Sequence, residues 1–160
     1  MVVACFSQIV EVDKQAPEAW CVVGNCFSLQ RETDSAIRYF QRALQIDPGF
    51  IYAHTLCGHE LVNNEDLEKA VACFRSALLY DDRHYNAWYG LGSIYFRQEK
   101  HELAEFHFRR AISINPVSSV LKCYLSMVLH AQQRTEKTTE ALQLLYDASV
   151  MDPKNPQVNL

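Results

Sequence analysis

Cysteine and histidine are the residues of this chain with the most reactive side chains, and there are six of each. A metal site needs three or four converging ligands, and two of them can come from one helix at a spacing of three or four residues. His54 and Cys57 have that spacing, but no two cysteines form a C-x-x-C pair. The cysteines therefore predict free thiols in a reducing compartment, with neither a disulfide framework nor a zinc ribbon.

The sequence patterns of catalysis and phosphate binding are missing. Gly90-x-Gly92 lacks the third glycine of a dinucleotide loop, and no G-x-x-x-x-G-K, H-E-x-x-H or G-x-S-x-G motif occurs. His101 and His107 lie six residues apart, too far for both to bind one ion from one helix. We therefore predict no catalytic residue, no cofactor and no metal.

The composition excludes other classes of protein. Of the 160 residues, 49% are hydrophobic and 21% are charged, as is usual for a globular domain. The formal net charge of −4 provides no overall basic field for nucleic acid or an anionic membrane. No apolar run approaches the roughly 20 residues that span a bilayer. We expect a soluble, intracellular protein with neither nucleic-acid nor membrane partners.

The elements that would position these side chains form a repeat of 34 residues. Gly24, Gly58 and Gly92 are separated by that interval, and four sets of small or aromatic residues share it: Ala19, Ala53 and Ala87; Ala36, Ala70 and Ala104; Phe40, Phe74 and Phe108; Ala43, Ala77 and Ala111. A fixed period of this length is typical of a repeat array.

Each period contains two helical stripes. From Trp88 to Tyr95 the apolar residues fall at i, i+3, i+4 and i+7, and a second stripe runs from Ala104 to Ala111 after a polar turn at 98–100. Pro116 ends the second helix. We expect the glycine to lie where the two helices cross too closely for a side chain. Helices are predicted near 2–12, 17–30, 33–46, 51–63, 67–80, 85–98, 101–114, 119–132 and 138–151.

The fourth period is longer than the others. Ala104 and Ala141 are 37 residues apart, as are Pro116 and Pro153. We place the three additional residues in the polar turn within 132–140, where they could loop out without disturbing the helices. The two ends resemble incomplete repeats, so we expect residues 1–160 to be a piece of a longer array.

The third period, WYGLGSIY followed by Ala104, Phe108 and Pro116, resembles the tetratricopeptide repeat (TPR). This resemblance implies an all-α solenoid of helix-turn-helix units wound into a right-handed superhelix. His54 and Cys57 then fall at packed positions and are expected in the core. The units would be the second helix of an incomplete repeat at 1–16, repeats at 17–50, 51–84, 85–118 and 119–155 (the last with the insertion), and the start of another at 156–160.

Stacked repeats create a concave surface that suits extended peptides. Helical phase places on it the residues roughly 80–160° from the packed stripe of each first helix. They are Glu18, Cys21, Asn25 and Ser28; Tyr52, Thr55, His59 and Val62; Asn86, Tyr89, Ser93 and Phe96; Val120, Cys123, Met127 and His130. No Lys or Arg is among them, which disfavours the clamping of acidic chaperone tails.

Three runs carry a more specific resemblance: PEAWCVVGNCFSLQRE (17–32), YAHTLCGHE (52–60) and RHYNAWYGLGSIYFRQEK (83–100). They include residues outside the repeat pattern, such as Asn25, Cys26, His59 and Glu60. Together they resemble the cell-division-cycle 27 subunits of the anaphase-promoting complex, a ubiquitin ligase. The resemblance implies a non-catalytic scaffold of the nucleus and cytoplasm. It would capture the C-terminal Ile-Arg tails of activators and of a core subunit, for ubiquitin-dependent degradation during mitosis.

For such a tail, Glu18 and Asn25 are predicted to bind the guanidinium group, and Tyr52, Tyr89 and Phe96 to form an apolar wall.

His59 and Ser93, one and two periods after Asn25, are predicted to donate hydrogen bonds to the peptide. The alternative is a general TPR adaptor for another extended peptide, which affinity for Ile-Arg tails would distinguish. An enzyme would instead show bound zinc or a reactive cysteine.

Overall fold

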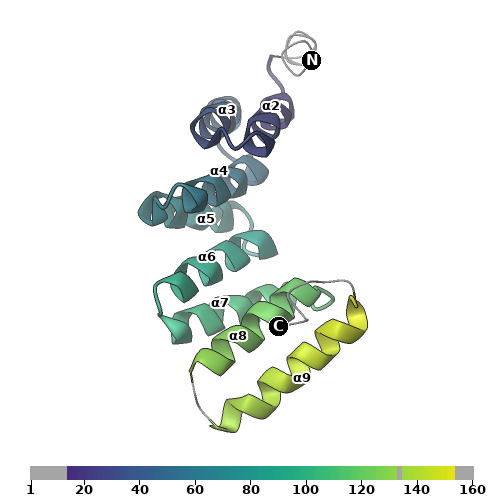
Figure 1. Cartoon of the computed structure of the whole chain (residues 1–160). Helices are drawn as coiled ribbons and strands as arrows, with labels where there is room; N and C mark the ends of the chain where they lie inside the picture. Colours follow the sequence, from purple (N-terminus) through teal and green to yellow (C-terminus); the bar gives the residue numbers. More distant parts are fainter. Residues whose placement is uncertain (1–13, 133–134, 154–160) are drawn as a thin grey trace. The chain divides into compact units, whose positions relative to one another are not determined.

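The computed structural model describes residues 14–132 and 135–153, and within them it contains eight α-helices and no strand (Figure 1). The prediction of an all-α fold is therefore confirmed. The helix predicted at 2–12 lies outside the described residues. None of the described helices is long and apolar enough to cross a membrane. The helices are α2 (Pro17–Leu29), α3 (Thr33–Ile46), α4 (Ile51–Asn63), α5 (Leu67–Tyr80), α6 (Tyr85–Arg97), α7 (His101–Ile114), α8 (Ser119–Ala131) and α9 (Thr135–Met151).

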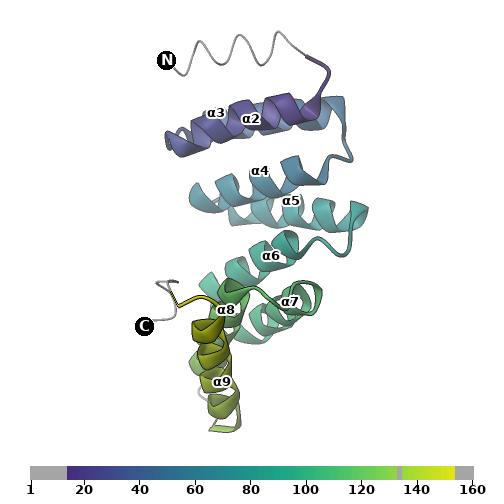
Figure 2. The ribbon, with the colours of Figure 1, turned by 90° about the vertical axis from the view of Figure 1, so that its right-hand side faces the viewer.

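Consecutive helices form hairpins, which Figure 2 shows side by side for α2 with α3 and for α4 with α5. The turns inside the first three hairpins have one conformation. Arg31, Glu65 and Glu99 adopt left-handed backbone angles, with φ of 61°, 61° and 58°. In each turn the next amide bonds back to the helix, as when Lys100 N donates to Tyr95 O at 2.9 Å. These bonds satisfy carbonyls that the helix end leaves open, which explains why the three turns have equal length.

The chain divides into two compact units, 1–82 and 83–160. Unit 1 contains α2–α5, and unit 2 contains α6–α9. In unit 1, Phe40 and Phe74 are fully buried beneath Gly24 and Gly58.

The glycines lie at the helix crossings, as the sequence predicts. A Cβ added to Gly58 would lie 2.7 Å from the ring of Phe74, and one added to Gly92 would lie 2.9 Å from the ring of Phe108. Real Cβ atoms do not approach another atom so closely, so either helix or ring would have to move. The close approach of the paired helices therefore depends on these glycines in both units.

The prediction that the insertion loops out is wrong. Helix α8 ends at Ala131 and α9 begins at Thr135, three residues before the predicted start at 138. The additional residues lengthen the helix instead: α9 has 17 residues, whereas α3, α5 and α7 have 14 each. Residues such as Glu136 and Lys137 have good helix propensity, and a helical turn satisfies backbone groups that a loop would leave open.

Candidate functional site

The predicted binding residues of unit 1 lie on α2 and α4. Glu18 is exposed near the start of α2 and Asn25 is half-buried further along it. On α4, Tyr52 is 48% exposed and packs edge-on against Phe50, with 6.4 Å between ring centroids. His59 is half-buried, and its ring lies edge-on to Phe74 at 5.0 Å. Tyr52 and Glu18 are thus the more accessible members of this set.

A buried carboxylate lies between the same two helices. Glu60 of α4 is only 6% exposed, and the Ser28 hydroxyl of α2 donates a hydrogen bond of 2.5 Å to Glu60 Oε1. Among the ion pairs of the described residues, none joins Glu60 to a lysine or arginine. Removing an ionised carboxylate from water costs several kcal/mol unless a cation or several donors compensate. Glu60 avoids part of this cost, because its second oxygen is not among the fully buried, unpartnered side-chain atoms of the described residues.

The repeat shows that the fold does not require a carboxylate here. The residues at the same place in the other periods are Cys26, Ile94 and Val128, and both Ile94 and Val128 are fully buried. An apolar side chain satisfies the packing at this position. Glu60 belongs to the run of resemblance at 52–60, but it is not among the predicted site residues. Comparison of equivalent positions at the 34-residue interval was the signal that could have found it.

In unit 2 the predicted binding residues also contribute to packing. The ring of Tyr89 contacts Phe108 and Tyr124, at centroid distances of 6.1 and 5.2 Å. Burial raises the pKa of Tyr89 to about 12, and the neighbouring Tyr124 adds to this rise. Phe96 packs against the core of unit 2, and the Ser93 hydroxyl is buried. These three side chains therefore stabilise the α6–α8 region and present limited surface.

A second carboxylate, in unit 2, is fully compensated. Glu105 of α7 accepts hydrogen bonds from Arg109 Nε at 2.9 Å, Gln132 Nε2 at 2.8 Å and Lys137 Nζ at 2.5 Å. Burial alone would raise the pKa of Glu105, but these donors lower it to about 2. Arg109 also forms a paired contact with Glu140 of α9, at 2.7 and 3.0 Å. Because Lys137 belongs to the additional turn of α9, the insertion helps to join α9 to α7.

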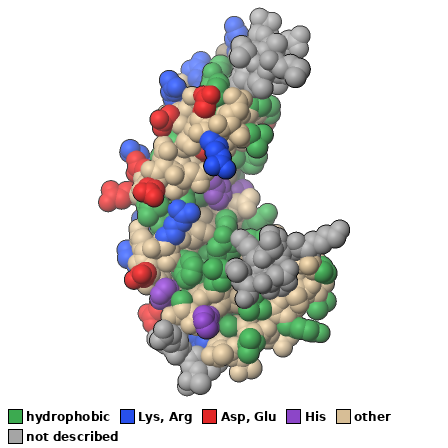
Figure 3. Space-filling model, viewed as in Figure 1, with side chains coloured by type: hydrophobic (Ala, Val, Ile, Leu, Met, Phe, Trp, Pro, Cys, Tyr) green, Lys and Arg blue, Asp and Glu red, His purple; other side chains and the backbone are tan. Residues whose placement is uncertain are grey.

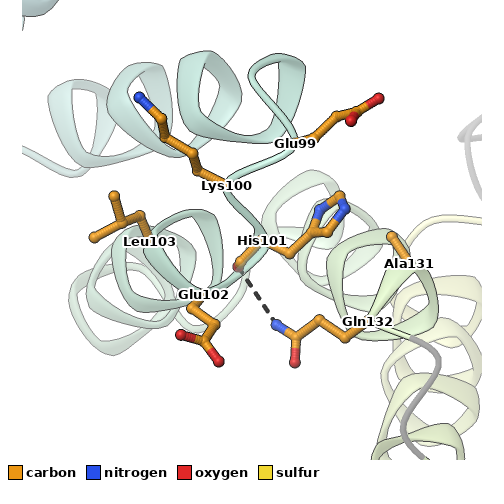
Figure 4. Close-up of a pocket in the computed structure, with 7 residues that line it drawn as sticks. All are labelled: Glu99, Lys100, His101, Glu102, Leu103, Ala131 and Gln132. Carbon is orange, nitrogen blue, oxygen red and sulfur yellow. Dashed lines mark hydrogen bonds between the residues drawn. The ribbon is translucent and has the colours of Figure 1, made fainter.

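The pocket in Figure 4 has a volume of about 500 Å³ and lies between the α6–α7 turn and the end of α8. The Gln132 amide donates to the His101 carbonyl at 3.4 Å across it. The side chains of Glu99, Lys100 and Glu102 point in different directions, so they do not converge on a common point. The pocket therefore lacks the arrangement that catalysis or ion binding requires.

The residues first considered for metal or thiol chemistry belong to the packing. His54 Nε2 lies 2.9 Å from the Pro48 carbonyl, and its ring stacks on Tyr80. Cys57 is buried, and burial raises the pKa of its thiol to about 12. The expectation that both residues lie in the core is confirmed for Cys57, whereas His54 is half-buried and packs against Tyr80. No group of three potential metal ligands occurs within residues 14–132 and 135–153.

The surface charges are mixed. On the face drawn in Figure 3, acidic and basic side chains lie among one another, without a continuous basic patch on that face. This distribution agrees with the formal net charge of −4.

Comparison with known families decides the classification. Two family models described as tetratricopeptide repeat match residues 17–50 and 58–119, which together are more than half of the chain. The chain belongs to the tetratricopeptide repeat family. This TPR chain is also similar to crystal structures of MamA (TM-score 0.76, 17% identity, 93% of this chain and 85% of that one) and of YrrB (0.68, 19%, 96% and 95%). At these identities the likeness concerns the fold alone.

Among its relatives, the TPR chain is similar to cell division cycle protein 27 homolog B of Arabidopsis thaliana, with 52% identity over 149 residues. It is also similar to anaphase-promoting complex subunit 3 of Schizosaccharomyces pombe, with 43% identity over 148 residues. The matches cover 93% and 92% of this chain but only 20% and 22% of those relatives, so the chain spans about a fifth of their length. Forty residues are 65% identical to the human cell division cycle protein 27 homolog, covering 25% of this chain and 5% of that relative.

Proposed function

We propose that this chain is a non-catalytic scaffold segment of an anaphase-promoting complex subunit, and that it binds the C-terminal Ile-Arg tails of activators and of a core subunit. The observation that carries this proposal is the 52% identity to a cell division cycle protein 27 homolog along 93% of the chain. Such a segment would act in ubiquitin-dependent protein degradation during mitosis, in the nucleus and cytoplasm. Its other contacts would be neighbouring TPR repeats and further subunits of the complex.

The exposed side chains of Glu18 and Tyr52 in unit 1 support peptide binding, whereas the unit 2 residues offer only part of their surface. In unit 1 the proposed contacts are Glu18, Asn25, Tyr52 and His59, and in unit 2 they are Tyr89, Ser93 and Phe96. The exposed ring of Tyr52 suits an isoleucine side chain or an arginine stem. A general TPR adaptor that binds another extended peptide by the same residues is the second candidate.

Peptide titration tests the proposal. A fluorescent peptide that ends in Ile-Arg should bind residues 1–160, and the same peptide with reversed order at its two last residues should bind at least about tenfold more weakly, since side-chain contacts and the terminal carboxylate would both be misplaced. Asn25→Ala, His59→Ala and Tyr89→Ala should each weaken binding. Gln41→Arg, at an exposed position of α3, is the matched control and should leave binding unchanged. Equal affinity for both peptides would favour the general adaptor.

A further inference from the structure

We infer that the exposed face of α7 docks an amphipathic helix of a partner protein. The apolar stripe of that helix contacts Leu103 and Phe106, and its carboxylates pair with Lys100 and Arg110. These four residues form the α7 patch. The inference goes beyond the proposed function, because the patch belongs to the second helix of a repeat, whereas the proposed peptide contacts lie on first helices.

The α7 patch has two large apolar side chains that are open to solvent. Leu103 is 46% exposed and Phe106 is 54% exposed. At 100° per residue, Leu103, Phe106 and Arg110 fall within an arc of about 60° around α7, so they share one face of the helix. Leu103 and Lys100 also line the pocket of about 500 Å³ in Figure 4. The apolar surface therefore continues into a hollow that can receive a side chain of the partner.

The other second helices show that the repeat does not need this apolar pair. Arg38 Nη2 donates a hydrogen bond of 3.3 Å to Ser35 Oγ at the equivalent positions of α3. Small or polar side chains therefore satisfy the fold at these positions, and an apolar pair there indicates a contact with another molecule. The residues equivalent to Leu103 and Phe106 are Ser35 and Arg38 in α3, Lys69 and Ala72 in α5, and Glu140 and Gln143 in α9.

The tryptophan and arginine beside the apolar pair occur in unit 1 as well. Arg42 lies 5.7 Å from the ring centroid of Trp20, and Arg110 lies 5.3 Å from that of Trp88. Only unit 2 adds a phenylalanine to this arrangement, with Phe106 edge-on to Trp88 at 6.2 Å. Aromatic side chains and arginine are enriched in protein–protein interfaces and among the residues that dominate their affinity. The α7 patch thus has the composition of an interface.

The charges of the patch favour a partner that carries carboxylates. Within residues 14–132 and 135–153, neither Lys100 nor Arg110 takes part in an ion pair. The Lys100 ammonium donates instead to the neutral Gln98 side chain, at 2.9 Å. Glu102 lies about 100° around the helix from Leu103 and thus outside the arc of the patch. A carboxylate of the partner could therefore form a charge-assisted hydrogen bond at each end of the apolar pair.

A helix fits this face better than an extended segment. The backbone of α7 is hydrogen-bonded within the helix, so it offers no partners to an extended chain, which needs them for its own N–H and C=O groups. A helix satisfies its backbone internally. Its side chains can then pack between those of Leu103 and Phe106, one turn apart on α7, as ridges of one helix pack into grooves of another.

The experiment uses a synthetic amphipathic helix of about 18 residues, long enough to be helical in water, with leucines at i, i+3, i+4 and i+7 and glutamates beside them. Its twin carries lysines in place of the glutamates. Residues 1–160 should bind the glutamate helix about tenfold or more tightly than the lysine twin. In the parent, the glutamate helix should shift the backbone amide resonances of residues 100–114 and leave those of residues 33–46 unchanged.

The variants exchange residues between equivalent positions of the repeats. Leu103→Ser combined with Phe106→Arg gives α7 the residues of α3 and should weaken binding of the glutamate helix by about tenfold or more. Ser35→Lys combined with Arg38→Ala gives α3 the residues of α5 and is the matched control, which should bind as the parent does. Lys100→Gln combined with Arg110→Gln keeps the apolar pair and should abolish the preference for glutamate over lysine.

Equal binding of the glutamate helix by the parent and by Leu103→Ser with Phe106→Arg would overturn the inference, as would equal binding of both helices by the parent. Sedimentation gives a further check. If residues 1–160 self-associate and the same two substitutions make them monomeric, the occupant is a second copy and the inference is wrong. An Ile-Arg peptide should bind this variant as it binds the parent, so the proposed function and the α7 patch can fail separately.

Discussion

Two carboxylates, one in each unit, are both largely shielded from solvent, but they differ in the groups that surround them. The side chain of Glu105 is 15% exposed and accepts hydrogen bonds from a lysine, an arginine and an amide. Glu60 is 6% exposed and accepts one hydrogen bond, from the Ser28 hydroxyl. In unit 2 the helices provide charged partners for the carboxylate, whereas in unit 1 the partner is a neutral hydroxyl.

This difference separates a carboxylate that joins several helices from one that makes a single contact between two helices. The partners of Glu105 come from α7, α8–α9 and the additional turn of α9, so its network joins the helices of unit 2. Glu60 joins α4 to α2 by a single hydrogen bond, which the Ser28 hydroxyl donates.

The largest effect is expected from placing a carboxylate where neither kind of compensation exists. Ile94→Glu would put an unpaired charge at a fully buried position of unit 2 and should lower the free energy of unfolding by about 3–5 kcal/mol. Urea unfolding at neutral pH measures it. Ile94→Val, the control, should lose only about 0.5–1.5 kcal/mol. A similar loss for both variants would show that the position tolerates a carboxylate and that Glu60 is unremarkable.

Substitution of the glycines at the helix crossings tests whether the helix pairs of both units pack in the same way. Gly58→Leu and Gly92→Leu should each push the paired helices apart and lower the free energy of unfolding by about 1–3 kcal/mol or more, because the new side chain would meet the buried phenylalanine ring. Thermal melting checks both. An unchanged melting temperature for Gly92→Leu would place that glycine outside the crossing.

Acid should weaken the Glu105 network. Since the donors lower the pKa of Glu105 from 4.5 to about 2, its stabilisation is present above pH about 4.5 and is lost as the pH falls towards 2. The loss attributable to this group should be on the order of 1–2 kcal/mol, reduced by solvent screening. Unfolding measured between pH 6 and 3 should be less pH-dependent in Glu105→Gln than in the parent. Parallel curves for the two proteins would contradict the assigned network.

The smallest effect concerns the hairpin turns. Glu65→Gly and Glu99→Gly should each raise the free energy of unfolding by up to about 1 kcal/mol, because both residues adopt the left-handed backbone region that glycine enters without strain. The increase in the free energy of unfolding should be the same for the two variants if the turns of the two units are equivalent. Glu68→Gly, inside the first turn of α5, should instead lose stability by about 0.5–1 kcal/mol.

The helices were predictable because the same pattern of packed residues recurs in each period. Glycine and phenylalanine at a fixed interval predicted the crossings, and Pro17 and the polar turns predicted the helix ends to within a residue for α2–α8. The start of α9 was not predictable in this way. A polar run of three additional residues fits either a loop or a longer helix, and the contact of Lys137 with Glu105 that favours the helix joins residues 32 positions apart.

The candidate site was only partly predictable. Helical phase predicted shared faces for the first-helix residues, but phase gives no burial, so it did not separate exposed Glu18 from half-buried Asn25 and His59. It also predicted that the apolar surfaces of Tyr89 and Phe96 are open to a peptide, whereas neighbouring rings cover part of them. The burial of these side chains and the open surface of the rings both depend on contacts between helices, which the sequence does not give.

The most direct test of the proposed function is to measure stability and peptide affinity together in Tyr52→Ala. The ring of Tyr52 is 48% exposed, so its removal costs the fold little and leaves its contact with the peptide as the main loss. We predict that the free energy of unfolding falls by less than about 1 kcal/mol, while affinity for an Ile-Arg peptide falls by about tenfold. A variant that keeps the stability of the parent and binds the peptide as tightly would contradict the account.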